Sequence, residues 1–547
     1  MGSSEDPNRK PDSAYESSAS IPFLSKTQYP SSSSSPPIEE DGSEESESNQ
    51  QYLHISYNQG PRSFKDLPFL ILFLLFFLST FAFGIFAIFN RNTNYSSLSS
   101  FTFDPNTTSC IYPSTSSSTS LSFDSSSLLV KGLIWTLVIT FVLSVPMCWA
   151  LLLLLKHYTK HVVYASLPFF IGIPIFLNVY WFVVCTISAS CSHAFPLAYR
   201  ILVMVFIFLV IGVIVWILVV NWHRVELTVS IIGVASDALS WNLGLFGVLP
   251  CLTIGLVVYY VPIVVFMVFA RFNGKIVAKD LEGEYACVWK EDSWVPAYFA
   301  LAILTMLWSA AAMLELQVYV ISGTVANWYF SKDYQAPKRS ITTSLRNAFG
   351  PSSGTICLSG LLIFVVRMVR SMVDSARQED APGIVNIVLR CCVNALLTAV
   401  DFLNKFTINF AAITGEAYCS SARMTYELLR RNLLSAVFVE TISSRLLALI
   451  VFVLSAIYTI VVCAILKAGT NLGDDSYFVA AMAWVLLIVV LGFLMHVLDN
   501  VIDTIYVCYA IDRDKGEVCK QDVHEVYVQL PISRSLRRSV IARTLGV

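Results

Sequence analysis

Apolar residues fill ten long stretches of the chain, and short polar segments separate them. An α-helix rises about 1.5 Å per residue, so about 20 apolar residues cross the ~30 Å hydrocarbon layer of a bilayer. The stretches cover residues 67–89, 128–155, 162–186, 196–220, 243–270, 295–322, 352–373, 383–414, 442–466 and 477–510. They predict an all-α polytopic membrane protein with about ten transmembrane helices.

Two segments between these stretches predict amphipathic helices that lie in the membrane interface. In residues 221–242, apolar positions recur at helical spacing beside Arg224 and Glu226. Residues 417–434 show a similar pattern and include Arg423. We expect both helices at the cytoplasmic surface.

The two ends of the chain differ in composition from the apolar region. Residues 1–66 are rich in serine and carry a net charge of about −6, with too few apolar residues to fold alone. We interpret them as a disordered cytoplasmic tail, with docking of cytosolic binders as an alternative. Residues 67–512 are then the transmembrane transporter domain, and residues 513–547 a cytoplasmic tail whose basic end meets anionic lipid.

Basic loop residues favour an orientation with both termini in the cytoplasm. With the N-terminus inside, 19 lysines and arginines fall on the inner side and nine on the outer side. The first outer loop also contains two glycosylation sequons, at Asn94 and Asn106. An even number of spans returns the C-terminus to the inner side.

Composition excludes several classes of function. Hydrophobic residues make up 55% of the chain and charged residues 14%, and a net charge of −2 gives no basic surface for nucleic acid. HExxH, GxxxxGK and GxGxxG motifs are absent, which argues against an enzyme and against a bound cofactor. The thirteen cysteines show no CxxC spacing, so no metal site is expected. Cys110, Cys191 and Cys287 fall in outer segments, and two of them could form a disulfide.

Polar residues at membrane depth are energetically expensive, so they are candidates for function. The sixth span contains Glu315, which could be a coupling or substrate carboxylate, the partner of an arginine, or a residue near the headgroups. Tyr319, Trp328 and Tyr329 follow it and are candidate aromatic contacts for a quaternary amine. Such an ion has no N–H group to donate, so aromatic rings are suitable partners.

Glycines and further charges distinguish the seventh, eighth and tenth spans. The glycine-rich run at 350–360 includes Gly354 and predicts either a broken helix that binds substrate or close helix packing. In the eighth span, Asp401 and Lys405 lie one turn apart and could pair. Asn394 and Asp401 share a face that should point into the bundle or a wet cavity, and Asn404 lies in the same span.

The tenth span carries a ladder of His496, Asp499 and Asp503. Carboxylates one turn apart repel each other unless a cation or a proton lies between them. The ladder therefore indicates either a vestibule that attracts cations or a proton site, or else carboxylates paired with Arg445 or with basic loop residues.

Four ordered motifs carry a resemblance to a known family. They are ISGTVANWYF at 321–330, GPSSGTICLSGLLIFVVRMVR at 350–370, ITGEAYCSSAR at 413–423 and DTIYVCYAIDRD at 503–514. Together they resemble the choline transporter-like family of solute carriers, over roughly residues 67–530. The resemblance implies a ten-helix carrier with cytosolic termini, a glycosylated first outer loop, and transport of choline or related amines. The short first loop with one cysteine departs from animal members, and the acidic tail is more similar to fungal or plant members.

We therefore expect a plasma-membrane carrier, with Golgi or endosomal membranes as further locations, that moves choline or a related cationic amine by alternating access. A non-transporting membrane scaffold or trafficking factor, and an ion channel, are the alternatives. The candidate substrate-binding residues are Glu315, Tyr319, Trp328, Tyr329, Gly354, Asp401, Asn404, Asp499 and Asp503. The expected partners are the amine and the lipid bilayer.

Overall fold

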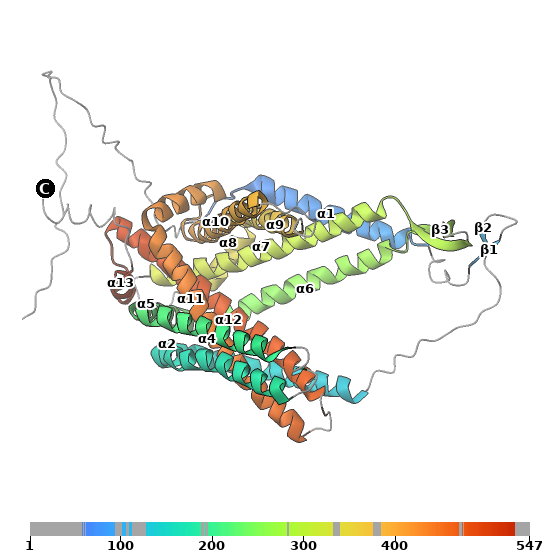
Figure 1. Ribbon diagram of the computed structural model, residues 1–547. Coiled ribbons are helices and arrows are strands. Elements are labelled where there is room, and N and C mark those ends of the chain that lie inside the picture. The colour runs from blue at the N-terminus through green and yellow to red at the C-terminus, as the bar shows by residue number, and fades with distance from the viewer. Residues whose placement is uncertain are drawn as a thin grey trace, which may run out of the picture. The chain divides into compact units, whose positions relative to one another are not determined.

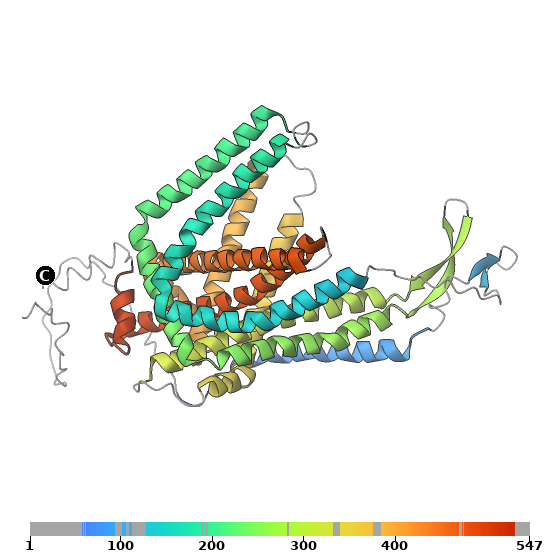
Figure 2. The ribbon, with the colours of Figure 1, turned by 90° about the horizontal axis from the view of Figure 1, so that it is seen from below.

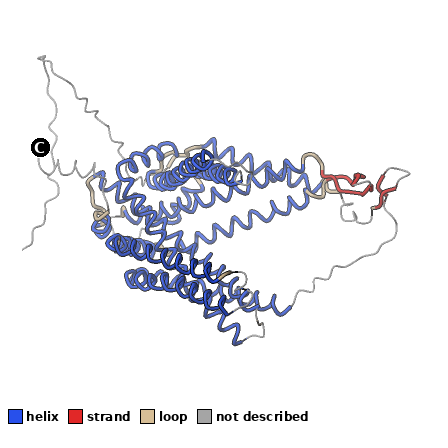
Figure 3. Tube along the Cα trace, in the orientation of Figure 1, coloured by secondary structure: helices blue, strands red, loops and turns tan. Residues whose placement is uncertain are grey.

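Long helices account for most of the chain, and two short β-hairpins lie beyond the ends of the helices (Figure 3). The computed structural model describes residues 62–92, 101–104, 109–111, 127–187, 195–281, 284–331, 340–375, 384–469 and 475–530, with residues 57, 60, 191 and 473. These residues belong to one unit, residues 53–547. The sequons at Asn94 and Asn106 lie outside the described residues, as do nearly all of the N-terminal tail and the basic C-terminal end.

The described elements follow the predicted order closely (Figure 1). The helices are α1 (Leu67–Phe89), α2 (Ser127–Ile187), α4 (Leu197–Val220), α5 (Trp222–Trp241), α6 (Leu245–Ala270), α7 (Val295–Tyr329), α8 (Ser340–Phe349), α9 (Ser353–Ser375), α10 (Ile384–Thr414), α11 (Tyr418–Gly469), α12 (Asp475–Lys515) and α13 (Gln521–Tyr527). Strands β1 (Thr102–Asp104) and β2 (Ser109–Ile111) pair antiparallel, as do β3 (Gly274–Leu281) and β4 (Glu284–Glu291). In the described part of the chain, nine helices are long and apolar enough to cross a membrane. The all-α polytopic prediction is confirmed.

Helix α2 contains two of the predicted spans in one element. It has 61 residues, about three times the ~20 that one crossing needs, and its backbone departs from helical geometry at Tyr158, where φ is −131° and ψ is 31°. Figure 2 shows that the helix turns sharply, with its second arm running beside α4. Counting the two arms separately gives the ten apolar spans that the sequence predicts.

Both segments predicted as interfacial helices are helical in the structure. The first forms α5, and the second is the beginning of α11. Half of the 20 residues of α5 are buried, among them Ile232 and Leu239, and the helix packs against α2 and α12. The second segment continues without a break into the ninth span, and together they form α11, which has 52 residues. A helix that buries half of its residues packs one broad face against its neighbours, so α5 is also part of the bundle.

Aromatic packing holds α1 against α6 and α7, which lie beside it in Figure 1. Phe81 packs edge-on against Phe266 at a centroid distance of 5.6 Å. Gly84 is necessary here, because a Cβ atom at this position would overlap the Phe266 ring. Thr80 and Thr305 add a buried hydrogen bond of 2.9 Å between α1 and α7.

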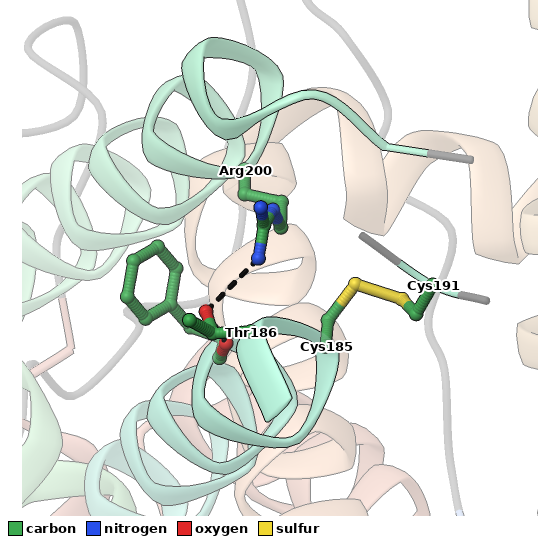
Figure 4. Close-up of a disulfide and its surroundings, with 5 residues drawn as sticks. Cys185, Thr186, Cys191 and Arg200 are labelled. Atoms are coloured by element: carbon green, nitrogen blue, oxygen red, sulfur yellow. Dashed lines mark hydrogen bonds between the residues drawn. A yellow bond between two sulfur atoms is a disulfide. The ribbon is translucent and has the colours of Figure 1, made fainter. Parts of the chain in front are cut away.

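Two disulfides lie at connections between helices. Cys110 of β2 is bonded to Cys287 of β4, so the first loop is tied to the hairpin that joins α6 to α7. Cys185 and Cys191 form the second bond, close to the hydrogen bond of 2.9 Å from Arg200 to Thr186 (Figure 4). The sequence left the pairing open and missed Cys185, because that residue falls inside an apolar stretch.

Candidate functional site

Glu315 lies in the middle of α7 and is only 9% exposed. Its carboxylate accepts hydrogen bonds at Oε2 from Ser359 Oγ (2.7 Å) and from Asn404 Nδ2 (3.2 Å). Among the described residues, no lysine or arginine lies within ion-pair distance of this carboxylate. An arginine is therefore not a direct partner of Glu315: the groups that contact the carboxylate are neutral donors, and Arg367 acts on it only from a longer distance.

Asn404 and Tyr418 extend this hydrogen-bond network from α7 and α9 to α10 and α11. The Tyr418 hydroxyl donates to Asn404 Oδ1 at 2.6 Å, and Ser359 Oγ lies 3.0 Å from the same atom. Burial, with the nearby charge of Glu315, raises the pKa of the Tyr418 hydroxyl, so it remains protonated at neutral pH. Because Tyr418 satisfies Oδ1, the Asn404 amide is oriented with its N–H group toward Glu315.

Small residues let α7, α9 and the N-terminal segment approach each other beside this network. A Cβ atom on Gly360 would lie 2.6 Å from Ala312 Cα, and one on Gly354 would overlap the backbone oxygens of Lys65 and Asp66. Both glycines lie within the regular helix α9, which begins at Ser353. The close-packing interpretation of the glycine run therefore holds within α9, and the interruption of the helix falls before it.

Residues 62–66, which we call the entry segment, bind across the same helices just before α1 begins. Asp66 Oδ2 accepts hydrogen bonds from Thr355 Oγ1 and from the Tyr418 backbone N–H, both at 2.8 Å. Asp66 adopts the left-handed φ of 51°, which is uncommon for residues other than glycine. A strained backbone persists only where surrounding contacts hold it, so the entry segment is held firmly in this conformation.

Arg62 makes the second attachment of the entry segment. Its guanidinium donates to Ala412 O at 2.7 Å and to the Tyr319 hydroxyl, which in turn donates to Ser352 Oγ at 2.7 Å. Gly415 follows the end of α10 with φ of 74°, and a side chain there would press against Arg62. The entry segment thus covers one end of the Glu315 network and joins α7, α9, α10 and α11.

A second charged cluster lies on the other side of α10. Lys405 Nζ is 2.7 Å from Glu440 of α11, and 3.0 Å and 2.5 Å from Asp499 and Asp503 of α12. Asp503 is fully buried, and Ser444 Oγ also donates to Asp499 at 2.8 Å. Three carboxylates thus surround one ammonium group, which takes the place that a free cation would need.

This cluster corrects two expected pairings. Lys405 does not pair with Asp401, which instead forms a partly exposed ion pair of 3.0 Å with Arg370. The basic partner of the carboxylate ladder is Lys405 and not Arg445. Asn394, which was expected to face the bundle, is exposed.

The remaining candidates are divided between separate places. Tyr319 belongs to the arginine attachment of the entry segment. Trp328 contacts Lys520 at 5.4 Å, and Tyr329 donates to Asp512 at 3.0 Å. Tyr329 follows Glu315 by 14 residues, or about 21 Å along a helix, so these two aromatic residues do not contact the Glu315 network.

Sequence reasoning missed four residues of the candidate site: Arg62, Asp66, Ser359 and Tyr418. Arg62 and Asp66 were included in the tail, although charged residues within five positions of an apolar helix could have indicated an ordered segment. Ser359 and Tyr418 fall inside quoted motifs, but nothing in the sequence distinguishes them from other small or aromatic residues there.

The fold and these polar networks define a multi-pass membrane protein with charged clusters enclosed between its later helices. The family described as plasma-membrane choline transporter matches residues 205–514, more than half of the chain. The chain therefore belongs to this family, as the four motifs indicated.

Individual relatives are distant. A CTL-like protein of Dictyostelium discoideum is 25% identical over 237 residues, which cover 41% of this chain and 43% of the relative. Protein PNS1 of Gibberella zeae is 27% identical over 30% of this chain and 31% of its own, and choline transporter-like protein 2 of Xenopus laevis is 24% identical over 39% and 32%. The chain spans less than half the length of the curated relatives it matches. The match to a fungal protein fits the fungal or plant character of the tail.

Proposed function

We propose that this protein transports choline or a related cationic amine across a membrane, with Glu315 balancing the charge of the amine. The observation that carries the proposal is a buried carboxylate held by Ser359 and Asn404 without a basic partner. Charged groups at membrane depth are usually paired, so an unpaired one is a candidate binding site for a cation. The family supplies the substrate class, since Xenopus laevis and Danio rerio relatives are named choline transporter-like proteins.

Transport also requires a path to Glu315, and we propose that the entry segment controls it from the cytoplasmic side. Because Glu315 is only 9% exposed, a choline-sized molecule reaches it only when neighbouring segments move. The entry segment is held by side-chain bonds of Arg62 and Asp66 rather than by a long helix, so it can be released without unfolding a span. Release and rebinding of this segment would be the cytoplasmic half of an alternating-access cycle.

The proposal includes the location and the orientation. The protein would lie in the plasma membrane, or also in Golgi or endosomal membranes, with both termini in the cytoplasm. The excess of basic residues in the inner loops supports this orientation.

Uptake of labelled choline into vesicles that contain the purified protein tests the carrier function and the role of Glu315. We expect uptake above protein-free vesicles, and we expect Glu315→Gln to raise KM by about 30-fold or more, because losing one partner of a buried charge pair costs about 2–5 kcal/mol. Glu291→Gln is the matched control, since Glu291 is exposed on β4, before α7 begins, and is not part of the network. Absence of both uptake and binding in the wild type would overturn the carrier function, whereas an unchanged KM in Glu315→Gln would overturn only the site.

A further inference from the structure

A pocket of about 280 Å³ lies at the sharp turn of α2, where the helix faces α5. The α2 side contributes His157, Thr159, Lys160 and His161, and the α5 side contributes Ser230 and Gly233. The Glu315 network uses none of these residues, and the turn of α2 lies outside the range 205–514 that the family model matches. The pocket therefore needs an explanation of its own.

The pocket contains one lysine and two histidines that are not paired with carboxylates among the described residues. Lys156, just outside it, is neutralised by Asp237 at 2.9 Å and also donates to Ser240 at 2.8 Å. In contrast, Lys160 has no carboxylate within ion-pair distance among the described residues, and neither His157 nor His161 has one. Three basic side chains within five residues favour an anionic ligand.

The position of the turn relative to the membrane identifies where such an anion would come from. Each arm of α2 is apolar and long enough to span a bilayer, so the turn between them must lie at a membrane surface. Since α1 crosses once and the first arm of α2 crosses back, this surface is on the same side as the entry segment. Phosphate groups of lipids are concentrated at this depth, and basic pockets between cytoplasmic helix ends can bind them.

The shape of the site also suits a lipid. Gly233 leaves the pocket open, because a Cβ atom there would lie 3.3 Å from Thr159 Oγ1 and would narrow the space between α5 and α2. The arms beside the turn expose apolar side chains, including Leu154 at 42% and Phe169 at 51%. A headgroup in the pocket could therefore keep its acyl chains against apolar surface.

We propose that this pocket binds the phosphorylated headgroup of an anionic phospholipid, with Lys160 as its cationic contact and the imidazoles of His157 and His161 as N–H donors. The Ser230 hydroxyl donates to Glu226 O at 3.3 Å and would have to turn from that carbonyl to bind a phosphate oxygen. The orientation described under Proposed function places the site in the cytoplasmic leaflet, where anionic lipids are enriched. The site is otherwise independent of Glu315 and of the transported molecule.

The test compares binding of dioctanoyl phosphatidylinositol 4-phosphate and dioctanoyl phosphatidylcholine to the purified full-length protein by native mass spectrometry. We expect clear preference for the phosphoinositide, about fivefold weaker binding in Lys160→Ala, and more than tenfold weaker binding in the variant with all three basic residues changed to alanine. Lys131→Ala is the control, because Lys131 is an exposed lysine near the other end of the same arm. Its binding should equal that of the wild type.

A second variant tests whether the pocket is the binding site, and a soluble competitor tests whether the ligand is a lipid. Gly233→Val should fill the pocket and weaken lipid binding while size-exclusion elution stays that of a folded protein. Equal binding of both lipids, or equal binding by wild type and the triple variant, would overturn the proposal. If inositol 1,4-bisphosphate competed as tightly as the lipid, the proposal of a lipid ligand would be overturned in favour of a soluble phosphate ligand.

Discussion

Two buried carboxylates of the bundle are balanced in different ways. Asp503 is fully buried and lies 2.5 Å from Lys405 Nζ, so its charge is satisfied within the protein. Glu315 receives only neutral donors. The first arrangement stabilises three helices, and the second leaves a charge for a ligand, which is why we place the amine at Glu315 and not at the tenth-span ladder.

This difference predicts a large structural effect of Lys405→Met. Removing the single ammonium leaves three carboxylates in contact, and breaking a buried pair in this way costs about 3–5 kcal/mol. The thermal transition of the detergent-solubilised protein should fall by several degrees. The double variant Lys405→Met with Asp503→Asn should recover part of that loss.

Asp401→Asn is the matched comparison for this experiment. Its ion pair with Arg370 is also 3.0 Å long, but the two side chains are 33% and 39% exposed. Exposed pairs contribute about 0–1 kcal/mol, so the transition should barely move. A loss in Lys405→Met no greater than that in Asp401→Asn would contradict the stabilising role of the cluster.

At the scale of whole elements, sequence and structure agree where the determining pattern is local. Each apolar stretch predicts its own helix, because the bilayer requirement applies to about 20 consecutive residues. The partners of Glu315 and Lys405 depend instead on which faces of α9, α10 and α12 meet, and no local pattern fixes that. The sequence did not predict the sharp turn in α2 either, because two helices separated by one non-helical residue have the same apolar pattern as two spans joined by a short loop.

The entry segment is the element whose mobility matters most for the proposed cycle, and Arg62→Ala should loosen it. Hydrogen bonds to charged groups contribute about 1.5–3 kcal/mol each, and each 1.4 kcal/mol changes an opening equilibrium about tenfold. Deuterium exchange at the Tyr418 amide, which donates to Asp66, should therefore become at least tenfold faster.

Lys65→Ala provides the control within the same segment. The Lys65 side chain reaches Glu416 only at 3.7 Å and is 33% exposed, while its backbone N–H donates to Pro351 O in any variant. Exchange at Tyr418 should remain close to that of the wild type. If Arg62→Ala and Lys65→Ala behaved alike, Arg62 would not be the attachment that holds the segment.

For the molecule as a whole, the disulfides and the basic loops support the same orientation by independent physics. With ten spans, Cys110, Cys191 and Cys287 fall on the side of the first loop, and Cys185 lies at the end of an arm on that side. Disulfides form in oxidising compartments, which supports the proposal that this side faces the exterior or a lumen. Free Cys419 and Cys519 fall on the opposite side, which the proposed orientation assigns to the cytoplasm on the count of lysines and arginines.

This agreement predicts a sharp difference in labelling between the two sides. A membrane-impermeant maleimide applied to intact cells should leave Cys419 and Cys519 unmodified until the membrane is permeabilised, and should label Cys110 and Cys287 only after reduction, as read by peptide mass spectrometry.

Burial and the neighbouring charge of Asp512 raise the pKa of the Cys519 thiol to about 12, so its reaction with the maleimide should be slow at pH 7 and should speed up as the pH rises toward that value. Glycosidase treatment should shift the mobility of the wild type but not of the Asn94→Gln, Asn106→Gln double variant. Labelling of Cys519 in intact cells would reverse the orientation, and with it the assignment of the entry segment to the cytoplasmic side.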